Sequence, residues 1–354
     1  MMKVKASALR RLGPLGLAAI LGIAVVSGCA TRGSSTNQVV VYTAEKEEII
    51  QAVAEMWAKA EPDIRLNTLA AGTNEVVQRV RAEAQRPLGD VIWGIGAEGM
   101  SAHPELFEPY ETKEHAAIDP RWLAVAEGEP WQPNNVVPMV VVYNTRLARG
   151  PGHTRGAPLI APQRWRDLAL FYNKGLLAYA APDKSGSAYT QLATMVSIFG
   201  DNEAGWKIIE QIMANAKILQ SSGKVIKGVA DGEYAIGITY ENIAGLYKRS
   251  GAPIEIVYPA EGTAVTPDGN ALIRGAPHPA PAKRFLDFLL SKAVQEMLAE
   301  KLSLRSVRTD VASPPGLSPI DEIKPAPGFD FRSAAQHQKD YLEKWQAVLL
   351  RIKQ

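Results

Sequence analysis

Small polar residues stand where a short apolar run gives way to a helical pattern. Residues 183–190 read Asp-Lys-Ser-Gly-Ser-Ala-Tyr-Thr. A serine or aspartate at a helix start is usually a cap worth about 1 kcal/mol. The same residues also suit an anion, because Ser185, Gly186 and Ser187 offer hydroxyl and backbone N–H groups at the positive end of a helix. Both roles are open for this segment taken by itself.

The same chemistry recurs where other strands are expected to end. Thr43 follows the first strand, Gly72 and Thr73 come before the second helix, and Tyr240-Glu241 follows a later strand. In an open α/β sheet, ligands bind beyond the carboxyl ends of the strands. Several hydroxyl-bearing turns in one chain therefore predict a single cleft around an oxyanion.

A glycine-rich stretch follows the expected strand at 90–93. Residues 94–99 match G-x-G-x-x-G, the pattern of dinucleotide-binding turns. That function also needs a helix at the third glycine and an acidic residue about 20 positions further on. Because residues 101–104 interrupt the region, we interpret Gly94 as part of a loop that exposes backbone N–H groups. Trp93 could pack in the core or line the cleft, and the sequence favours neither.

Catalytic and metal-binding patterns are weak in this chain. Residues 221–224 fit S-x-x-K, a serine nucleophile motif, but its S-D-N and K-T-G companions are absent from the sequence. The five histidines are scattered, without H-E-x-x-H spacing. We therefore expect a protein that is not an enzyme and has no cofactor and no metal site. A secreted phosphohydrolase is a remote alternative.

The single cysteine, Cys29, lies where a bacterial lipid anchor would be attached. Basic residues come first, an apolar run at 15–26 follows, and Ser-Gly precedes the cysteine. This order is typical of an export signal, and the ending Val-Ser-Gly-Cys resembles the lipobox of bacterial lipoproteins. We predict a signal peptide at 1–28, a flexible tether at 29–37, a lipid anchor on Cys29 and an extracytoplasmic location at a membrane.

The charge of the chain argues against a nucleic-acid partner. The formal net charge is +2, and the expected signal holds four cations and no acid, which leaves the mature part at −2. Binding to nucleic acid usually needs a clustered basic face. We expect a monomer with no nucleic-acid partner.

Short apolar strands alternate with amphipathic helices along the chain. Strands are expected at 38–42, 64–69, 90–93, 136–144, 176–181, 235–239 and 271–274, and helices at 45–60, 75–84, 282–302 and 333–352. This alternation predicts an α/β protein. Extended segments at 136–144 and 257–265 bracket a central block and predict two crossing strands. They divide the mature chain into lobe 1, at 38–138 and 264–354, and lobe 2, at 139–263.

The order of these pieces resembles the extracytoplasmic substrate-binding proteins of ABC importers. The closest branch is the one known for ferric iron, phosphorylated sugars, phosphoglycerate and aminoethylphosphonate. The resemblance covers 38–311 and is carried by the lipobox, the first strand with its Tyr-Thr, and the motifs DVIWG at 90, KSGSAYT at 184, GITYE at 237, VYPAEGT at 257 and RSVRTDV at 305. It implies a type II periplasmic-binding-protein fold. Each lobe would hold a mixed, mostly parallel sheet flanked by helices, and a two-strand hinge would join the lobes. The ligand would bind between the lobes and pass to a membrane permease with its ATPase.

The expected ligand follows from the oxygens available to hold it. Ferric members of the branch hold iron with a neighbouring pair of tyrosines, and none of the eleven tyrosines here adjoins another. Hydroxyl groups and helix N-termini suit a phosphate or phosphonate instead. We therefore predict a small anionic ligand of the hexose phosphate, phosphoglycerate or aminoethylphosphonate class, with ferric iron as the alternative.

Each predicted binding residue has an expected role. Hydroxyls would hold the anion, Glu241 would accept hydrogen bonds from a sugar hydroxyl or an amine, and Tyr240 and Trp93 would pack against the ligand body. Arg305 and Arg308 would add positive charge or form exposed ion pairs. The predicted binding residues are Thr43, Glu45, Gly72, Thr73, Trp93, Gly94, Ser185, Gly186, Ser187, Tyr189, Tyr240 and Glu241.

Overall fold

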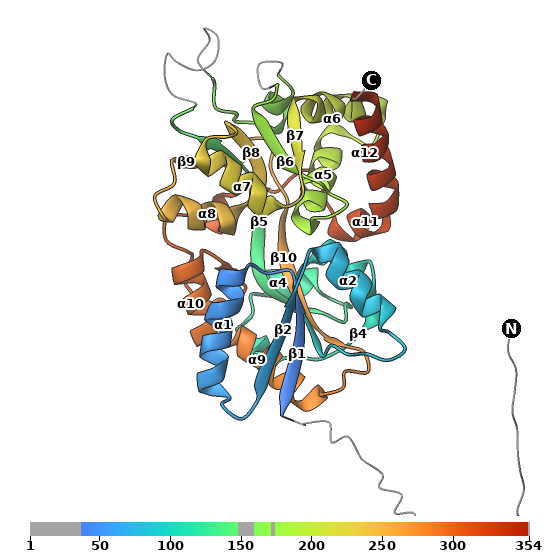
Figure 1. Cartoon of the computed structure of the whole chain (residues 1–354), viewed down its shortest axis with the longest axis vertical. Helices are drawn as coiled ribbons and strands as arrows, with labels where there is room; N and C mark the ends of the chain where they lie inside the picture. The colour runs from blue at the N-terminus through green and yellow to red at the C-terminus, as the bar shows by residue number, and fades with distance from the viewer. Residues whose placement is uncertain (1–36, 148–158, 171–173, 353–354) are drawn as a thin grey trace, which may run out of the picture. The chain divides into compact units, whose positions relative to one another are not determined.

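The computed structural model describes residues 37–147, 159–170 and 174–352 (Figure 1). The predicted signal peptide, the predicted lipidation site at Cys29 and nearly all of the tether lie outside these residues. Thr36–Gln354 forms one compact unit. Among the described residues, no helix has the length and apolar character needed to cross a bilayer.

Strands and helices alternate through most of this unit, as the sequence predicts. The strands are β1 (Gln38–Thr43), β2 (Arg65–Ala70), β3 (Val91–Gly96), β4 (Phe107–Glu108), β5 (Gln132–Asn144), β6 (Leu177–Ala180), β7 (Ala216–Leu219), β8 (Ile236–Tyr240), β9 (Ile254–Val257), β10 (Val265–Ile273) and β11 (Arg305–Ser306). The helices are α1 (Glu47–Ala60), α2 (Thr73–Ala82), α3 (Ala97–Ser101), α4 (Pro120–Val125), α5 (Gly186–Phe199), α6 (Glu203–Asn215), α7 (Ser222–Asp231), α8 (Glu241–Arg249), α9 (Pro279–Leu290), α10 (Lys292–Leu302), α11 (Phe331–Gln336) and α12 (Gln338–Ile352). The elements without a counterpart among the predicted ones include α3, α4, α6, α7, β4, β7, β9 and β11.

The sheet runs through both lobes in the order β2-β1-β3-β10-β5-β8-β6-β7. Strands β1, β2 and β3 pair in parallel in lobe 1, and β6, β7 and β8 pair in parallel in lobe 2. Strand β5 joins the two, because its first half pairs with β10 and its second half with β8 and β9. Figure 1 shows β5 and β10 as the strands that pass between the lobes.

The second crossing differs from the one expected at 257–265. Strand β9 ends at Val257, and the chain enters the next strand, β10, only at Val265. The apolar run at 257–265 includes Pro259 and Gly262, which interrupt a strand. The crossing strand is therefore β10, which starts where the expected one ends.

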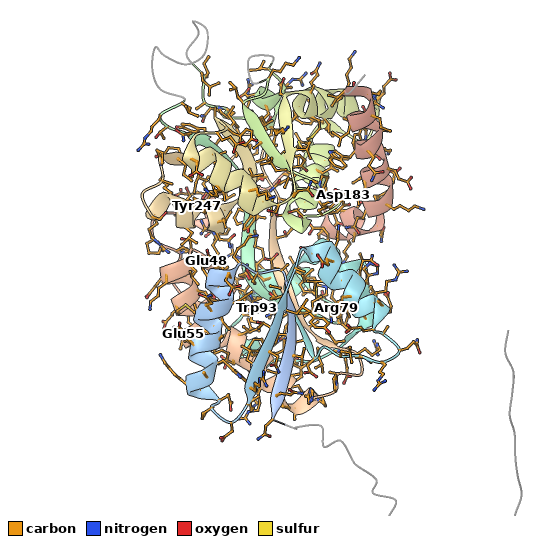
Figure 2. All side chains as sticks on the ribbon, viewed as in Figure 1. Glu48, Glu55, Arg79, Trp93, Asp183 and Tyr247 are labelled. Carbon is orange, nitrogen blue, oxygen red and sulfur yellow. The ribbon has the colours of Figure 1, made fainter. Side chains whose placement is uncertain are left out.

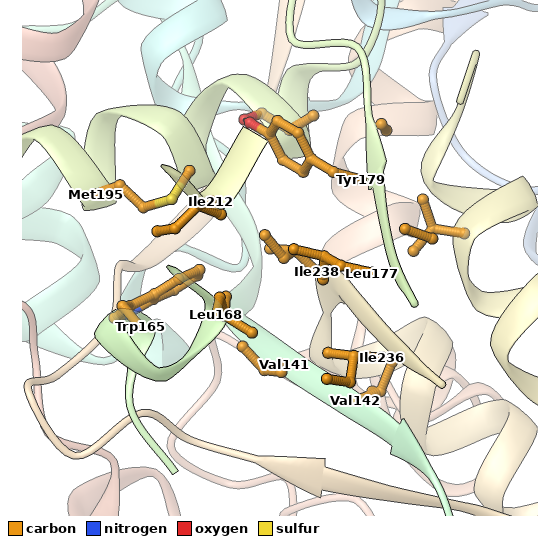
Figure 3. Packing of buried hydrophobic residues seen from close by; sticks show 14 of the residues in the cluster. Val141, Val142, Trp165, Leu168, Leu177, Tyr179, Met195, Ile212, Ile236 and Ile238 are labelled. Carbon is orange, nitrogen blue, oxygen red and sulfur yellow. The ribbon is translucent and has the colours of Figure 1, made fainter. Parts of the chain in front are cut away.

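Each lobe has its own apolar core. In lobe 2, the side chains of Trp165, Leu168 and Ile238 are fully buried between the sheet and its helices (Figure 3). In lobe 1, Trp57 and Phe285 pack edge to face with ring centroids 5.2 Å apart. Burial of each such side chain contributes about 1.5–3 kcal/mol, so the cores hold the strand ends in fixed positions.

The last helix, α12, packs outside lobe 1, to which the prediction assigned it. Helix α11 packs on α3 in lobe 1, where Phe331 contacts Trp131 with ring centroids 6.2 Å apart. Helix α12 packs on α6, and Trp345 and Val348 join the core of lobe 2. The predicted helix at 333–352 is thus two helices that meet at His337. Helix α12 packs on lobe 2, whereas α11 packs on lobe 1 and also contacts α5 of lobe 2 through Ala334.

The predicted helix at 282–302 is also divided. Ser291 has an extended backbone (φ −60°, ψ 146°) and separates α9 from α10. Its hydroxyl donates to the carbonyl of Phe288 at 2.7 Å. A serine that hydrogen-bonds to the nearby backbone competes with helical pairing, which accounts for the break.

Candidate functional site

A cavity of about 690 Å³ lies beyond the strand ends of both lobes. Its volume falls in the range of about 300–1,000 Å³ that is typical of small-molecule sites. Lobe 1 lines it with residues that follow β1, β2 and β3, and lobe 2 with residues that follow β6, β7 and β8. The predicted binding residues in the lining are Glu45, Gly72, Thr73, Gly94, Ser185, Gly186, Ser187 and Tyr240.

Three serine hydroxyls form a cluster on the lobe 2 wall. Ser185 Oγ lies 3.2 Å from Ser187 Oγ and 3.0 Å from Ser222 Oγ, and the last two oxygens are 2.8 Å apart. Ser185 is the N-cap residue of α5 but makes no capping hydrogen bond with its side chain. Because the hydroxyl is not used as a cap, it is available to a ligand.

Three helices begin at this part of the cavity. Helices α5 and α7 begin at Gly186 and Ser222, and α2 of lobe 1 begins at Thr73. A methyl group on Gly186 would lie 2.7 Å from Thr73 Oγ1, so only a glycine allows this approach. Asn74 Nδ2 donates to the backbone carbonyl of Asp183 at 2.7 Å, which joins the two lobes directly. Figure 2 labels Asp183, which lies on the lobe 2 side of this contact.

Lys46 extends from lobe 1 toward the start of α7. It lines the cavity, and its Nζ lies 3.7 Å from the point that a Cβ on Gly223 would occupy. No hydrogen bond or ion pair with another described residue engages the ammonium, and burial lowers its pKa. A cation at the positive end of a helix is unfavourable. An anion bound there would interact favourably with both the Lys46 ammonium and the N-terminus of α7.

Carboxylates line the opposite wall of the cavity, in lobe 1. Glu45 follows β1 and packs on Gly94, whose φ of +71° and missing side chain leave room for the carboxylate. Asp268 lies on β10 beside Gly96 and accepts a hydrogen bond from Asn135 at 3.3 Å.

Burial disfavours ionisation of these acids. It raises the pKa of Glu45 to about 8, with the negative charge of Asp268 adding to the shift. It raises the pKa of Asp268 and of the adjacent, buried Glu98 to about 7. These acids would therefore ionise near neutral pH, where a bound cation could change their protonation.

Two of the predicted residues serve the fold of lobe 1 rather than the cavity surface. Thr43 is fully buried, and its hydroxyl accepts a hydrogen bond from the backbone N–H of Glu45 at 3.0 Å. Trp93 is also fully buried and packs on Phe285 with ring centroids 6.1 Å apart. The Thr43 hydroxyl, which was expected to hold the anion, lies outside the cavity lining and contacts the backbone of Glu45 instead. Trp93 belongs to the core.

Two further predicted residues are engaged elsewhere. The Tyr189 hydroxyl donates to the backbone carbonyl of Ala334. Glu241 is 1% exposed and forms a bidentate ion pair with Arg305 at 2.5 and 2.8 Å. Glu241 therefore has no free oxygen for a ligand. Arg308 is buried and pairs with Glu114 at 2.6 Å, so neither predicted arginine forms a fully exposed ion pair or lines the candidate cavity.

Several cavity residues were not predicted from the sequence. Ser222 lies inside the S-x-x-K pattern, where Ser221 acts as the cap of α7 and accepts from the Lys224 N–H. The informative feature of this segment is its position in a strand-to-helix turn between β7 and α7, not its match to a nucleophile motif. The other unpredicted polar residues in the lining include Lys46, Asn74, Asn242 and Asp268.

A ferric site receives little support from these side chains. Within the described part of the chain, no group of three or more His, Cys, Asp or Glu residues is arranged to hold a metal ion. Tyr240 is the one tyrosine among the described lining residues, and burial raises its pKa. A buried tyrosine with a raised pKa resists the ionisation that hard metal ions require.

Comparisons with known proteins agree with this architecture. Residues 52–326 match the family described as "Bacterial extracellular solute-binding protein". A Salmonella typhimurium protein named for 2-aminoethylphosphonate binding in the periplasm is 26% identical over 70% of this chain and 71% of its own length. The major ferric iron-binding protein of Neisseria meningitidis is 22% identical over 81% of this chain and 86% of its own length.

Solved structures extend the likeness to the fold. The periplasmic binding protein AfuA from Actinobacillus pleuropneumoniae, with fructose 6-phosphate bound, aligns with a TM-score of 0.80 and 25% identity, over 87% of this chain and 97% of AfuA. Such neighbours have the type II periplasmic-binding-protein fold, so the predicted fold class and resemblance are confirmed.

Proposed function

This chain belongs to the family of bacterial extracellular solute-binding proteins, and we propose that its ligand is a phosphorylated or phosphonate-bearing small molecule. As the substrate-binding component of an ABC transporter, the protein acts outside the cytoplasm and delivers its ligand to a membrane permease. The observation that carries the ligand proposal is the serine cluster at the starts of α5 and α7, with the unpaired Lys46 facing it.

The energetics of such a site are sufficient for capture. A hydrogen bond to a charged group contributes about 1.5–3 kcal/mol, and each helix N-terminus adds about 0.3–1 kcal/mol. Association costs at least about 4 kcal/mol. Four or five contacts would leave the roughly −8 kcal/mol of a micromolar binder.

The relatives support more than one ligand, and the cavity favours the phosphorus oxyanions. The names of related proteins include both 2-aminoethylphosphonate and ferric iron, and AfuA holds a sugar phosphate. A phosphoryl or phosphonyl group presents three acceptor oxygens, which match hydroxyls, amides and an ammonium. Ferric iron would need anionic ligands at the same position, where the serine cluster offers neutral ones.

Calorimetry on the purified protein would test the proposal. We expect micromolar or tighter binding of at least one of glucose 6-phosphate, phosphoglycerate and 2-aminoethylphosphonate, and about tenfold weaker binding of the same compound by the Ser222→Ala variant. Mass spectrometry of the ligand that the purified protein carries would identify the compound. If none of the three compounds binds and ferric iron binds tightly, the site would be assigned to iron. Turnover of a generic phosphoester would favour the hydrolase.

A lipid anchor on Cys29 completes the proposal. The lipobox-like sequence before this cysteine supports it. The anchor would keep the protein beside its permease, on the outer side of a membrane, after the signal peptide is removed.

A further inference from the structure

A glutamate side chain is buried where the two lobes meet. Glu98 lies on α3 of lobe 1, directly after β3, and is only 2% exposed. It does not line the cavity. Its carboxyl accepts hydrogen bonds from its own backbone N–H and, across the interface, from the hydroxyl of Thr190 on α5 of lobe 2. Oε1 of this carboxyl is buried and has no hydrogen-bond partner among the described residues.

The groups around Glu98 do not offset the cost of burying a charge there. Asp268 on β10 repels the carboxylate, and Tyr189 on α5 is its titratable neighbour in lobe 2. Strand β3 carries no titratable side chain. Helices α2 and α11 also pack on α3 and carry Glu75 and Arg332, and the arginine is already paired with a carboxylate. Burial, with a smaller contribution from Asp268, therefore raises the pKa of Glu98 to about 7.

Separation of the lobes would change the surroundings of this carboxyl. Helix α5 belongs to lobe 2, so opening moves Thr190 away from Glu98 and lets water reach the carboxyl. In water the carboxyl has its ordinary pKa of 4.5 and is ionised at neutral pH. It must regain a proton before it is buried again, because a charge with few hydrogen bonds is strongly disfavoured inside a protein.

We propose that closure of the lobes takes up one proton from the solvent at Glu98, which couples ligand capture to protonation of a residue outside the cavity. This coupling rests on the proposed function only in that ligand binding favours the closed form. It does not depend on the class of ligand, because Glu98 does not line the cavity. The closed form is favoured below the ordinary pKa of the carboxyl, and this preference is lost as the pH rises through about 7.

The competing explanation is that Glu98 stays covered when the lobes separate. Helix α11 packs on α3 and also contacts α5 through Ala334, and it would then shield the carboxyl in the open form. Glu98 would keep its proton in both forms, and a neutral side chain in its place would not change how binding depends on pH. The two explanations therefore differ in the pH dependence of affinity.

The Glu98→Gln variant isolates this residue, because an amide has the shape of the protonated carboxyl and does not titrate. We expect the unmodified protein and the variant to bind with similar affinity at pH 5. At pH 8 the unmodified protein should bind about 10- to 100-fold more weakly than the variant, since its closure requires an unfavourable protonation. Calorimetry with glucose 6-phosphate, phosphoglycerate and 2-aminoethylphosphonate would give both dissociation constants. Their ratio cancels the titration of the compound itself and of the cavity acids.

Glu55→Gln is the matched control, because it removes a carboxylate from the exposed face of α1 outside the cavity (Figure 2). This variant should follow the unmodified protein at both pH values. A ratio between the unmodified protein and Glu98→Gln that stays constant from pH 5 to pH 8 would overturn the coupling and leave the proposed function intact. Failure of all three compounds to bind at either pH would overturn the proposed function itself.

Small-angle scattering without ligand tests the coupling independently of the compounds. We expect the unmodified protein to become less compact between pH 5 and pH 8, and Glu98→Gln to remain as compact at pH 8 as at pH 5. Equal dimensions of the unmodified protein at both pH values would contradict the coupling, even if none of the three compounds binds or the variant does not fold. Thermal melting at pH 5 would show whether the variant is folded.

Discussion

Replacement of Lys46 by methionine should weaken ligand binding without weakening the fold. The ammonium lies at the start of α7, and its lowered pKa shows that the folded protein without ligand disfavours its charge, chiefly through burial. Removal of the charge should therefore leave the melting temperature unchanged or slightly higher, by the equivalent of about 0.3–1 kcal/mol at a helix N-terminus. A bound oxyanion makes the charged form of Lys46 favourable, because the anion interacts with the ammonium directly.

The size of the effect follows from that interaction. A hydrogen bond between charged groups contributes about 1.5–3 kcal/mol, so the dissociation constant should rise about 10- to 150-fold. Calorimetry with 2-aminoethylphosphonate and glucose 6-phosphate would measure this change, and thermal melting without ligand would measure stability. Lys59→Met, on the exposed last turn of α1, is the control. A lower melting temperature with unchanged affinity would refute the reasoning, since that result describes a purely structural lysine.

Four further predictions test other parts of the site. Ser222→Ala should raise the dissociation constant about tenfold in calorimetry, because it removes one hydroxyl donor to the anion; an unchanged constant would exclude this hydroxyl. Without ligand, the melting temperature should fall from pH 5 to pH 8, because Glu45, with its pKa raised to about 8, keeps a proton that the unfolded chain has lost. The Glu45→Gln variant should show a smaller fall. A fall as large as that of the unmodified protein would contradict the role of Glu45. Gly186→Ala should hinder closure and weaken binding, since its methyl group would meet Thr73 at 2.7 Å; small-angle scattering with ligand would show whether the variant still closes. Cys29→Ser should release the protein from the membrane fraction, and retention there would argue against a lipid anchor.

The sequence located one wall of the cavity better than the other. Ser185 and Ser187 could be found because they lie between a recognisable strand and a helix, and because similar hydroxyl-bearing turns recur at other expected strand ends. Asp268 gave no such signal, since a lone aspartate in an apolar strand does not reveal what lies opposite it. The role of Lys46 could not be predicted from the sequence either, because it depends on α7, which starts far away in the sequence.

Glu241 shows why charged residues mislead a sequence-based prediction. Its place after a strand was correct, but its partner Arg305 lies 64 residues further along the chain. Nothing local distinguishes a carboxylate that binds a ligand from one that is neutralised inside the fold. Pairing across such distances is set by tertiary packing.

The placement of α12 is likewise set by tertiary packing and could not be predicted from its local sequence. Its apolar face predicts that the helix packs on something, and the face is equally suited to either lobe. Packing on α6, with Trp345 in the core of lobe 2, is decided by the shape of the partner surface. Patterns of hydrophobicity give the existence of a helix more securely than its neighbours.

The division of the C-terminal segment between the lobes constrains how the protein can open. Helix α11 contacts both lobes, through Phe331 on lobe 1 and through Ala334 on α5 of lobe 2, and Trp345 anchors α12 to lobe 2. A movement of one lobe relative to the other about β5 and β10 would therefore also have to change the packing of this C-terminal segment, which is a third connection between the lobes. Opening of the cleft for ligand release would therefore be limited by how far the lobes can separate before α11 loses its contacts with one of them.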